Sequence, residues 1–193
     1  MQDFKIFTES KADIKFLKDY IEDVFKIKLA DENFDSLGSW AGYKAGGNLN
    51  ASIKQNTEDG KANILIIDAD VNIDFRRKEV VEDFQKYNIP IKLFLFPNDA
   101  HNGALENILC EIATKKDILA CFDKYEECIK GHEVPVIKSK VFAYLDALLP
   151  SKNKKNDKYD LIQEKNRNYR NIEHWDLQYE YLNPLKDFLT PFF

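Results

Sequence analysis

The sequence predicts an α/β protein with a central parallel sheet of about four strands flanked by helices, followed by an α-helical C-terminal extension. Short apolar runs alternate with segments whose apolar residues recur at helical spacing, as in right-handed βαβ units. The run at residues 64–67 is too short for a helix and suits a strand covered on both faces. After residue 112 only helical patterns continue.

The N-terminal segment predicts a strand at residues 4–8 that passes directly into a helix. Ser10 can cap that helix, and Asp13 stands at capping-box spacing from it. We therefore interpret Asp13 as a capping residue. The apolar residues of the helix repeat at helical intervals and are Ile14, Leu17, Ile21, Val24 and Phe25.

The middle of the chain supplies the other predicted strands. Residues 34–43 can hold a second strand, and the turn at Gly46-Gly47 opens a short helix at about residues 49–54. The strand before Asp68 is followed by an amphipathic helix that carries Val80 and Phe84 on one face. A last strand at residues 91–96 is stopped by Pro97.

Residues 1–112 form the predicted α/β domain, and residues 113–193 form the extension packed on it. Helical spacing predicts helices at residues 118–129 and 141–149. Near the C-terminus a stripe at helical spacing is expected to pack against the sheet, with Pro184 starting a final helix. The stripe consists of Trp175, Tyr179, Leu182, Leu185 and Leu189.

Carboxylates follow two of the predicted strands. Asp68 and Asp70 come after the strand at residues 64–67, and strand alternation predicts that they point the same way. Glu9 stands where the first strand ends. In open parallel sheets the functional crevice lies beyond the carboxyl ends of the strands, so we expect these residues to converge. Repelling carboxylates of this kind favour a hard cation such as Mg²⁺ or Mn²⁺.

Several further residues have both a functional and a plainer interpretation. Glu106 can join the metal ligands or complement the dipole of the helix it begins. His101 can act as a general acid or base, or be an exposed loop residue. Arg76, Arg77 and Lys78 lie near a helix start, where they can bind phosphate or form a solvated face.

These motifs resemble the Toprim domain of topoisomerases, DnaG-type primases and overcoming-lysogenization-defect nucleases, over roughly residues 4–112. The resemblance rests on Glu9 after the first strand with Asp13 four residues on, on Asp68-Ala69-Asp70, and on Leu105-Glu106. Ser10 stands where the family usually has glycine. The segment at residues 96–106 is most similar to a small bacterial Toprim-like family of unknown function.

The resemblance implies metal-dependent phosphoryl transfer or phosphodiester hydrolysis, with Glu9, Asp68, Asp70 and Glu106 holding Mg²⁺ or Mn²⁺. Glu9 and His101 are the candidates for proton transfer. The alternative is a Toprim-shaped binding or regulatory module without turnover. A nucleotide-sugar transferase or a haloacid-dehalogenase-like phosphatase also uses Asp-x-Asp, but the phosphatase usually has Thr or Val where this chain has Asn72.

Composition limits the partners. The net charge of −5 argues against a broad nucleic-acid-binding surface. A nucleic acid or nucleotide can still be bound by a metal and a local basic patch. Residues 151–156 form such a patch, although their composition is also typical of a solvated linker. No apolar run is long enough to span a membrane, and the N-terminus lacks signal-peptide features, so we expect a cytoplasmic protein. The three cysteines are an odd number in a chain without export signals, which argues against a disulfide scaffold.

Overall fold

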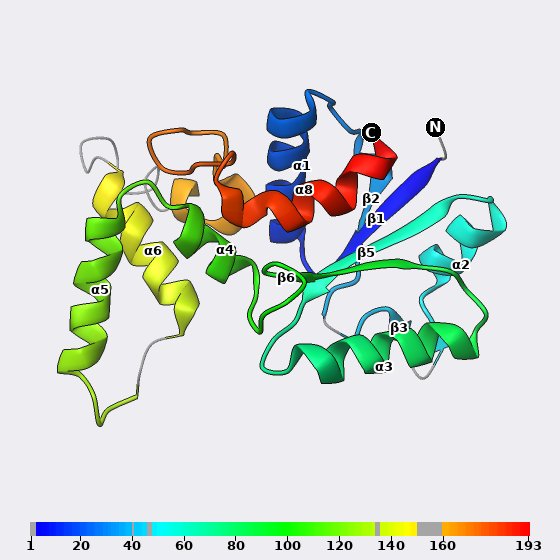
Figure 1. The fold of residues 1–193 in the computed structure, drawn as a ribbon, viewed down its shortest axis with the longest axis horizontal. Coiled ribbons are helices and arrows are strands. Elements are labelled where there is room, and N and C mark those ends of the chain that lie inside the picture. The colour runs from blue at the N-terminus through cyan, green and yellow to red at the C-terminus, as the bar shows by residue number, and fades with distance from the viewer. Residues whose placement is uncertain (1–2, 40, 46–47, 134–135, 150–159) are drawn as a thin grey trace.

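A computed structural model describes residues 3–39, 41–45, 48–133, 136–149 and 160–193 of the chain. At its centre is a four-stranded parallel sheet with the strand order β2-β1-β5-β6 (Figure 1). The strands are β1 (Phe4–Thr8), β2 (Phe34–Ser36), β5 (Ala62–Asp68) and β6 (Lys92–Phe96). The α/β class and the parallel sheet predicted from the sequence are confirmed.

Helices lie on both faces of the sheet because the strand residues alternate between two apolar clusters. Ile64 and Ile66 of β5 pack with α1 (Lys11–Phe25), whereas Leu65 and Ile67 pack with α3 (Ile73–Lys86). The second cluster also receives Ile53 from α2 (Ala51–Glu58). In Figure 1, α1 and α8 (Asn183–Leu189) lie on one side of the sheet and α3 on the other.

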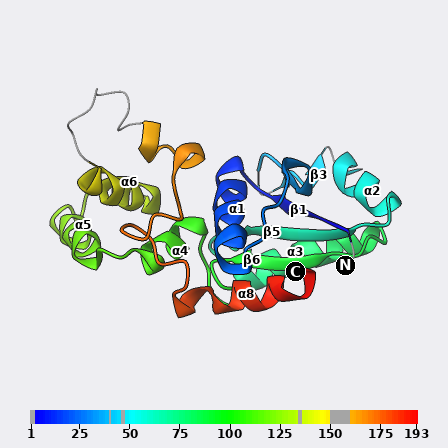
Figure 2. The ribbon, with the colours of Figure 1, turned by 90° about the horizontal axis from the view of Figure 1, so that it is seen from above.

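Helix α4 (Leu105–Ile112) ends the α/β domain, and the extension begins with α5 (Lys116–Cys128) and α6 (Ile137–Leu148). Figure 2 shows α5 and α6 at one end of the molecule, while α8 runs back along the sheet. One apolar cluster includes strand residues such as Phe94 together with Tyr144 of α6 and Leu189 of α8. The extension is therefore joined to the sheet by a continuous core.

The predicted second strand is present but covers only Phe34–Ser36, and a separate two-stranded hairpin follows, with β3 at Lys44–Ala45 and β4 at Asn48–Leu49. The final helix predicted to start at Pro184 is confirmed as α8, which begins at Asn183. Trp175 of the C-terminal stripe lies in an irregular segment before it. Tyr179 is 39% exposed, whereas the other four members of the stripe are buried in the core.

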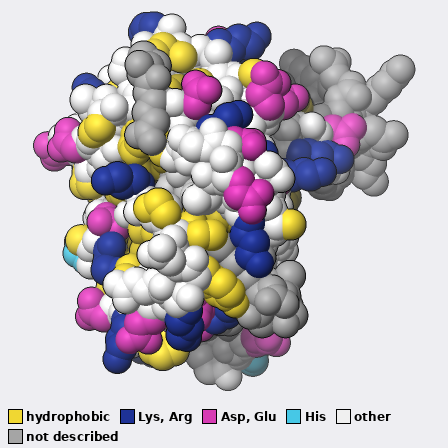
Figure 3. Space-filling model, turned by 90° about the vertical axis from the view of Figure 1, so that its right-hand side faces the viewer, with side chains coloured by type: hydrophobic (Ala, Val, Ile, Leu, Met, Phe, Trp, Pro, Cys, Tyr) yellow, Lys and Arg dark blue, Asp and Glu magenta, His cyan; other side chains and the backbone are white. Residues whose placement is uncertain are grey.

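The predicted Gly46-Gly47 turn and the basic segment at residues 151–156 lie outside the described residues. The three cysteines are free thiols. Among the described helices, none has both the length and the apolar character needed to cross a membrane. On the face shown in Figure 3, acidic and basic side chains are interspersed.

Candidate functional site

The strand order brings Glu9 and Asp68 together. From β1 the chain crosses to β2 at one edge of the sheet, and from β5 it crosses to β6 at the other, so β1 and β5 are neighbours where the direction of winding reverses. Ligands of open α/β sheets bind at such a point. Glu9 follows β1, and its Oε1 accepts a hydrogen bond from the backbone N–H of Asp68 at 3.3 Å.

The predicted cap of α1 is confirmed, and it also delivers a carboxylate to this place. The Ser10 hydroxyl accepts hydrogen bonds from the backbone N–H groups of Ala12 and Asp13, both at 3.2 Å. The Asp13 side chain accepts the Ser10 N–H in return at 2.8 Å, which completes a capping box. The buried Asp13 carboxylate therefore caps the helix and faces the end of the sheet.

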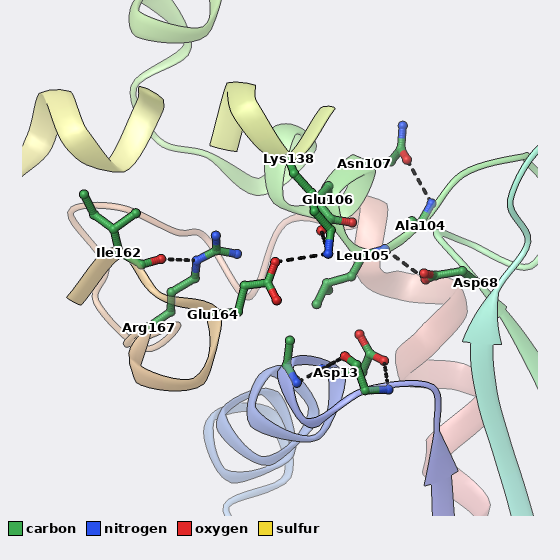
Figure 4. A network of polar contacts seen from close by, with 12 residues as sticks. Asp13, Asp68, Ala104, Leu105, Glu106, Asn107, Lys138, Ile162, Glu164 and Arg167 are labelled. Carbon is green, nitrogen blue, oxygen red and sulfur yellow. Dashed lines mark hydrogen bonds and ion pairs between the residues drawn. The ribbon is translucent and has the colours of Figure 1, made fainter. Parts of the chain in front are cut away.

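A cavity of about 220 Å³ lies beside these residues, and we call it the acidic cavity. Glu9, Asp13 and Asp68 line one side, and Glu106 in the first turn of α4 lines another. The extension closes it with three charged side chains, Lys138, Glu164 and Arg167. Figure 4 shows Asp13 and Asp68 facing Glu164 and Arg167 across this space.

Burial raises the pKa of three of these carboxyl groups. The pKa of Asp68 rises to about 8 because desolvation disfavours its charge, and the nearby Asp13 and Glu9 carboxylates add to the rise. Desolvation also raises the pKa of Glu9 to about 7, against the attraction of Arg76, and that of Asp13 to about 6. The cavity thus holds carboxyl groups that are only partly ionised at neutral pH without further positive charge.

Asp70 does not line the acidic cavity. Strand β5 ends at Asp68, and Asp70 has a left-handed φ of 53°, so the alternation that predicted a common direction for the two aspartates does not extend to it. The Asp70 side chain is 51% exposed and forms an ion pair with Arg76. Arg76 is buried and also lies 3.6 Å from Glu9 Oε1, while its Nε donates to the Asp68 carbonyl at 3.2 Å.

The turn at Asp70 is fixed by Gly103, which exchanges two backbone hydrogen bonds with it at 2.9 and 2.7 Å. Gly103 has a φ of 138°, and a Cβ there would lie 2.5 Å from Oδ1 of Asn107. That oxygen accepts the Ala104 N–H at the start of α4. A side chain at residue 103 would therefore disturb both the Asp70 turn and the helix that carries Glu106.

We expect Gly103→Ala to lower the free energy of unfolding by about 2 kcal/mol, because it adds a steric contact to an unfavourable backbone conformation. Gly60→Ala is the matched control: Gly60 also has a positive φ, 72°, but has open space around it. Urea denaturation of both variants measures the difference. Equal destabilisation of the two would contradict the role of the Asn107 contact.

The three cations predicted to bind phosphate are not brought together. Arg77 binds Asp99, with 2.8 Å between Nη2 and Oδ1. Lys78 is exposed and pairs with Glu82 at 3.8 Å. Together with the inward position of Arg76, these contacts place the three side chains in different surroundings. Their assignment to phosphate stays a prediction.

His101 and Glu106 have different surroundings. His101 is exposed, and its Nδ1 lies 2.9 Å from Nδ2 of Asn98 in the same loop. Glu106 is buried, and Lys138 Nζ lies 3.5 Å from its Oε1. The same ammonium lies 3.2 Å from Glu164 Oε1, so it bridges the two carboxylates. Glu106 belongs to the acidic cavity, and His101 does not line it.

Sequence reasoning missed the second role of Asp13 and all the extension residues of the cavity. Asp13 could have been found from its place four residues after Glu9 in the Toprim-like pattern. Lys138, Glu164 and Arg167 lie in segments without any recognisable motif, and only tertiary packing brings them to the strand ends.

Carboxylate oxygens suit Mg²⁺ or Mn²⁺, and a bound cation would favour the ionised forms of Glu9 and Asp68 against the desolvation that raises their pKa. Within the described ranges, however, no three histidine, cysteine, aspartate or glutamate side chains are already spaced to hold one ion. The residues fit a metal by chemistry, and the side chains would have to turn toward a common point to bind it.

Fold and site define an α/β protein with an acidic cavity at the switch point of its parallel sheet. Comparison with protein-family models, curated proteins and solved structures finds no match. The Toprim resemblance therefore continues to rest on the sequence motifs alone.

Proposed function

We propose that the acidic cavity carries out metal-dependent phosphoryl transfer or phosphodiester hydrolysis, with Glu9, Asp68 and Glu106 as the candidate ligands of Mg²⁺ or Mn²⁺. The observation that carries the proposal is the convergence of carboxylates from β1, β5 and α4 on one cavity at the switch point. Asp13 adds a fourth carboxylate there, and Asp70 stands outside the cavity as a candidate outer residue.

The residues of the chain have separable tasks in this proposal. The bound metal would polarise a phosphoryl oxygen and lower the pKa of a bound water. Glu9 is also the candidate for proton transfer, because its carboxylate lies at the strand ends beside Asp68. The Asp68 carboxylate is held in place by the Leu105 N–H, which donates to its Oδ1 at 3.2 Å.

The second candidate function is a binding or regulatory module without turnover. Arg76 favours it, because this buried guanidinium contacts both Glu9 and Asp70 and supplies positive charge where a cation between them would lie. In that case the carboxylates contribute to an internal ion-pair network, and no divalent ion is needed.

Calorimetric titration with Mn²⁺ at pH 8 separates the two functions. We expect the unmodified protein to bind Mn²⁺ and Asp68→Asn to bind it about tenfold more weakly or worse. Asp35→Asn is the matched control, because Asp35 is also on a strand, β2, but faces Lys5 at 3.8 Å outside the cavity. Its affinity should equal that of the unmodified protein.

The same three proteins should then be assayed with bis(p-nitrophenyl) phosphate and p-nitrophenyl phosphate in Mn²⁺. Hydrolysis that requires Mn²⁺ and is lost in Asp68→Asn supports catalysis and identifies the diester or monoester preference. If the unmodified protein does not bind Mn²⁺, the metal-dependent function is overturned. The binding or regulatory module is then the remaining candidate.

A further inference from the structure

The wall of the acidic cavity opposite the strand ends is formed by the extension. Lys138 is in the first turn of α6, and Arg167 directly follows the 3₁₀ turn at Glu164–Asn166. Both line the cavity together with Glu9 and Asp68. The cavity therefore has carboxylates on the sheet side, and two cations together with Glu164 on the extension side (Figure 4).

Arg167 is the unusual member of this wall. It is only 2% exposed, yet no carboxylate of the described residues lies within ion-pair distance of its guanidinium. Its Nε donates to the Ile162 carbonyl at 3.0 Å, and its guanidinium carbon lies 5.3 Å from the centre of the Phe142 ring. Figure 4 shows the other two nitrogens directed away from Ile162, toward Glu164 and Lys138.

A buried guanidinium without a carboxylate partner is costly, because its charge is removed from water without full compensation. One N–H of Arg167 is used by Ile162, and the remaining edge presents a planar fork of donors toward the cavity. Such a fork matches two oxygens of a phosphate group. The side chain is therefore positioned to bind an anion that none of the described residues supplies.

A second polar group lies beside Arg167. The hydroxyl of the fully buried Tyr169 makes no hydrogen bond of good geometry with the described residues. Burial raises its pKa to about 12, and the charge of Arg167 and a side-chain hydrogen-bonding contact with it oppose this rise. An oxyanion bound to Arg167 would give the hydroxyl an acceptor within the same space.

We infer that Arg167, assisted by Lys138, binds the phosphate group of a phosphomonoester or phosphodiester in the acidic cavity. This inference rests on the proposed function and adds to it the side of the site that recognises substrate. The cavity volume of about 220 Å³ is several times the volume of one water, so a phosphate group and an ion with its remaining waters can share it. Lys138 is a weaker contact, because it is 56% exposed and already bridges Glu106 and Glu164.

The experiment is calorimetric titration of inorganic phosphate into the full chain at pH 7 with saturating Mn²⁺. We expect binding to the unmodified protein, a loss of affinity of about tenfold or more in Arg167→Gln, and a smaller loss in Lys138→Gln. Arg170→Gln is the matched control, since Arg170 is three residues away but pairs with Glu22 at 2.8 Å outside the cavity. Its phosphate affinity should be unchanged.

Arg167 is buried, so Arg167→Lys is included to keep the charge while removing the fork. It should retain the fold, as followed by circular dichroism, and bind phosphate with intermediate affinity. Phosphate binding that is equal in the unmodified protein, Arg167→Gln and Arg167→Lys overturns the inference. The inference is also overturned if the unmodified protein binds Mn²⁺ but no phosphate. That result would still support the metal site.

The converse failure is also distinguishable. If Mn²⁺ does not bind, the proposed function falls, and the phosphate titration is repeated at pH 6 in EDTA. Phosphate binding that depends on Arg167 under these conditions supports an anion site by itself, and its absence overturns the inference. Titration with acetate in parallel tests the ligand class, because acetate binding as tight as phosphate binding would contradict a phosphate-specific fork.

Discussion

Asp68→Asn is expected to make the metal-free protein more stable at pH 8, by about 2 kcal/mol, although it replaces a partly buried carboxyl group that accepts a hydrogen bond. Folding raises the pKa of Asp68 from its ordinary value of 3.8 to about 8, so between these two pH values the folded state binds more protons than the unfolded state. Stability from this group is therefore fully present below about pH 4 and is lost as the pH rises to 8. The neutral asparagine does not lose it.

Asparagine can also keep the local structure, because its Oδ1 can accept the Leu105 N–H that now binds Asp68 Oδ1. Glu9 and Asp13 have raised pKa values too, so the unmodified protein should lose stability over the same pH range. Urea denaturation in EDTA at pH 5 and pH 8 measures the effect. An unmodified protein that becomes more stable from pH 5 to pH 8, or an Asp68→Asn variant that is less stable at pH 8, would show that these carboxyl groups are not destabilised by burial.

Trp175→Ala is expected to cost about 4 kcal/mol of unfolding free energy. The side chain is buried between the rings of Tyr144 and Tyr169, whose centres lie 5.2 and 6.1 Å away. The backbone beside it is tied to the end of α4, because the Asp176 N–H donates to the Ile112 carbonyl at 2.8 Å. Removal of the indole therefore leaves a cavity where the C-terminal segment joins α4 and α6.

Trp175→Phe should cost clearly less than Trp175→Ala. It keeps most of the apolar contact and removes an indole N–H that is buried without a hydrogen-bond partner among the described residues. Tyr125→Ala is the control, because Tyr125 is an aromatic residue of the extension that is half exposed. Chemical denaturation of the three variants gives the ranking, and a Trp175→Ala loss as small as that of Tyr125→Ala would refute the central position of the indole.

Much of the fold could be predicted from the sequence because its signals are local. The apolar run at residues 64–67 and the alternation at residues 4–8 lie in β5 and β1, and the Ser10 cap begins α1 as expected. The C-terminal stripe shows the limit of such reasoning. Helical spacing correctly selected Trp175 as a core residue, but a buried aromatic in an irregular segment produces the same spacing as one on a helix.

The candidate site was predictable only where strand ends determine it. Glu9 and Asp68 meet because of sheet topology, which periodicity reveals. The position of Asp70 depends on its left-handed backbone conformation and on its pairing with Gly103. Strand alternation predicts neither of these features. Arg167 could not be found because Glu106 and the carboxylates at the strand ends are more than 60 residues away in sequence, and no spacing rule connects them to it.

The continuous core between the sheet and the extension has a consequence for how the cavity tolerates change. Both walls of the cavity are attached to one apolar cluster, which includes Ile66 of β5, Val141 of α6 and Leu185 of α8. A repacking of any of these side chains alters the separation of the walls without touching a charged group. The separation of the two walls therefore depends on apolar contacts outside the cavity, to which both the α/β domain and the extension contribute.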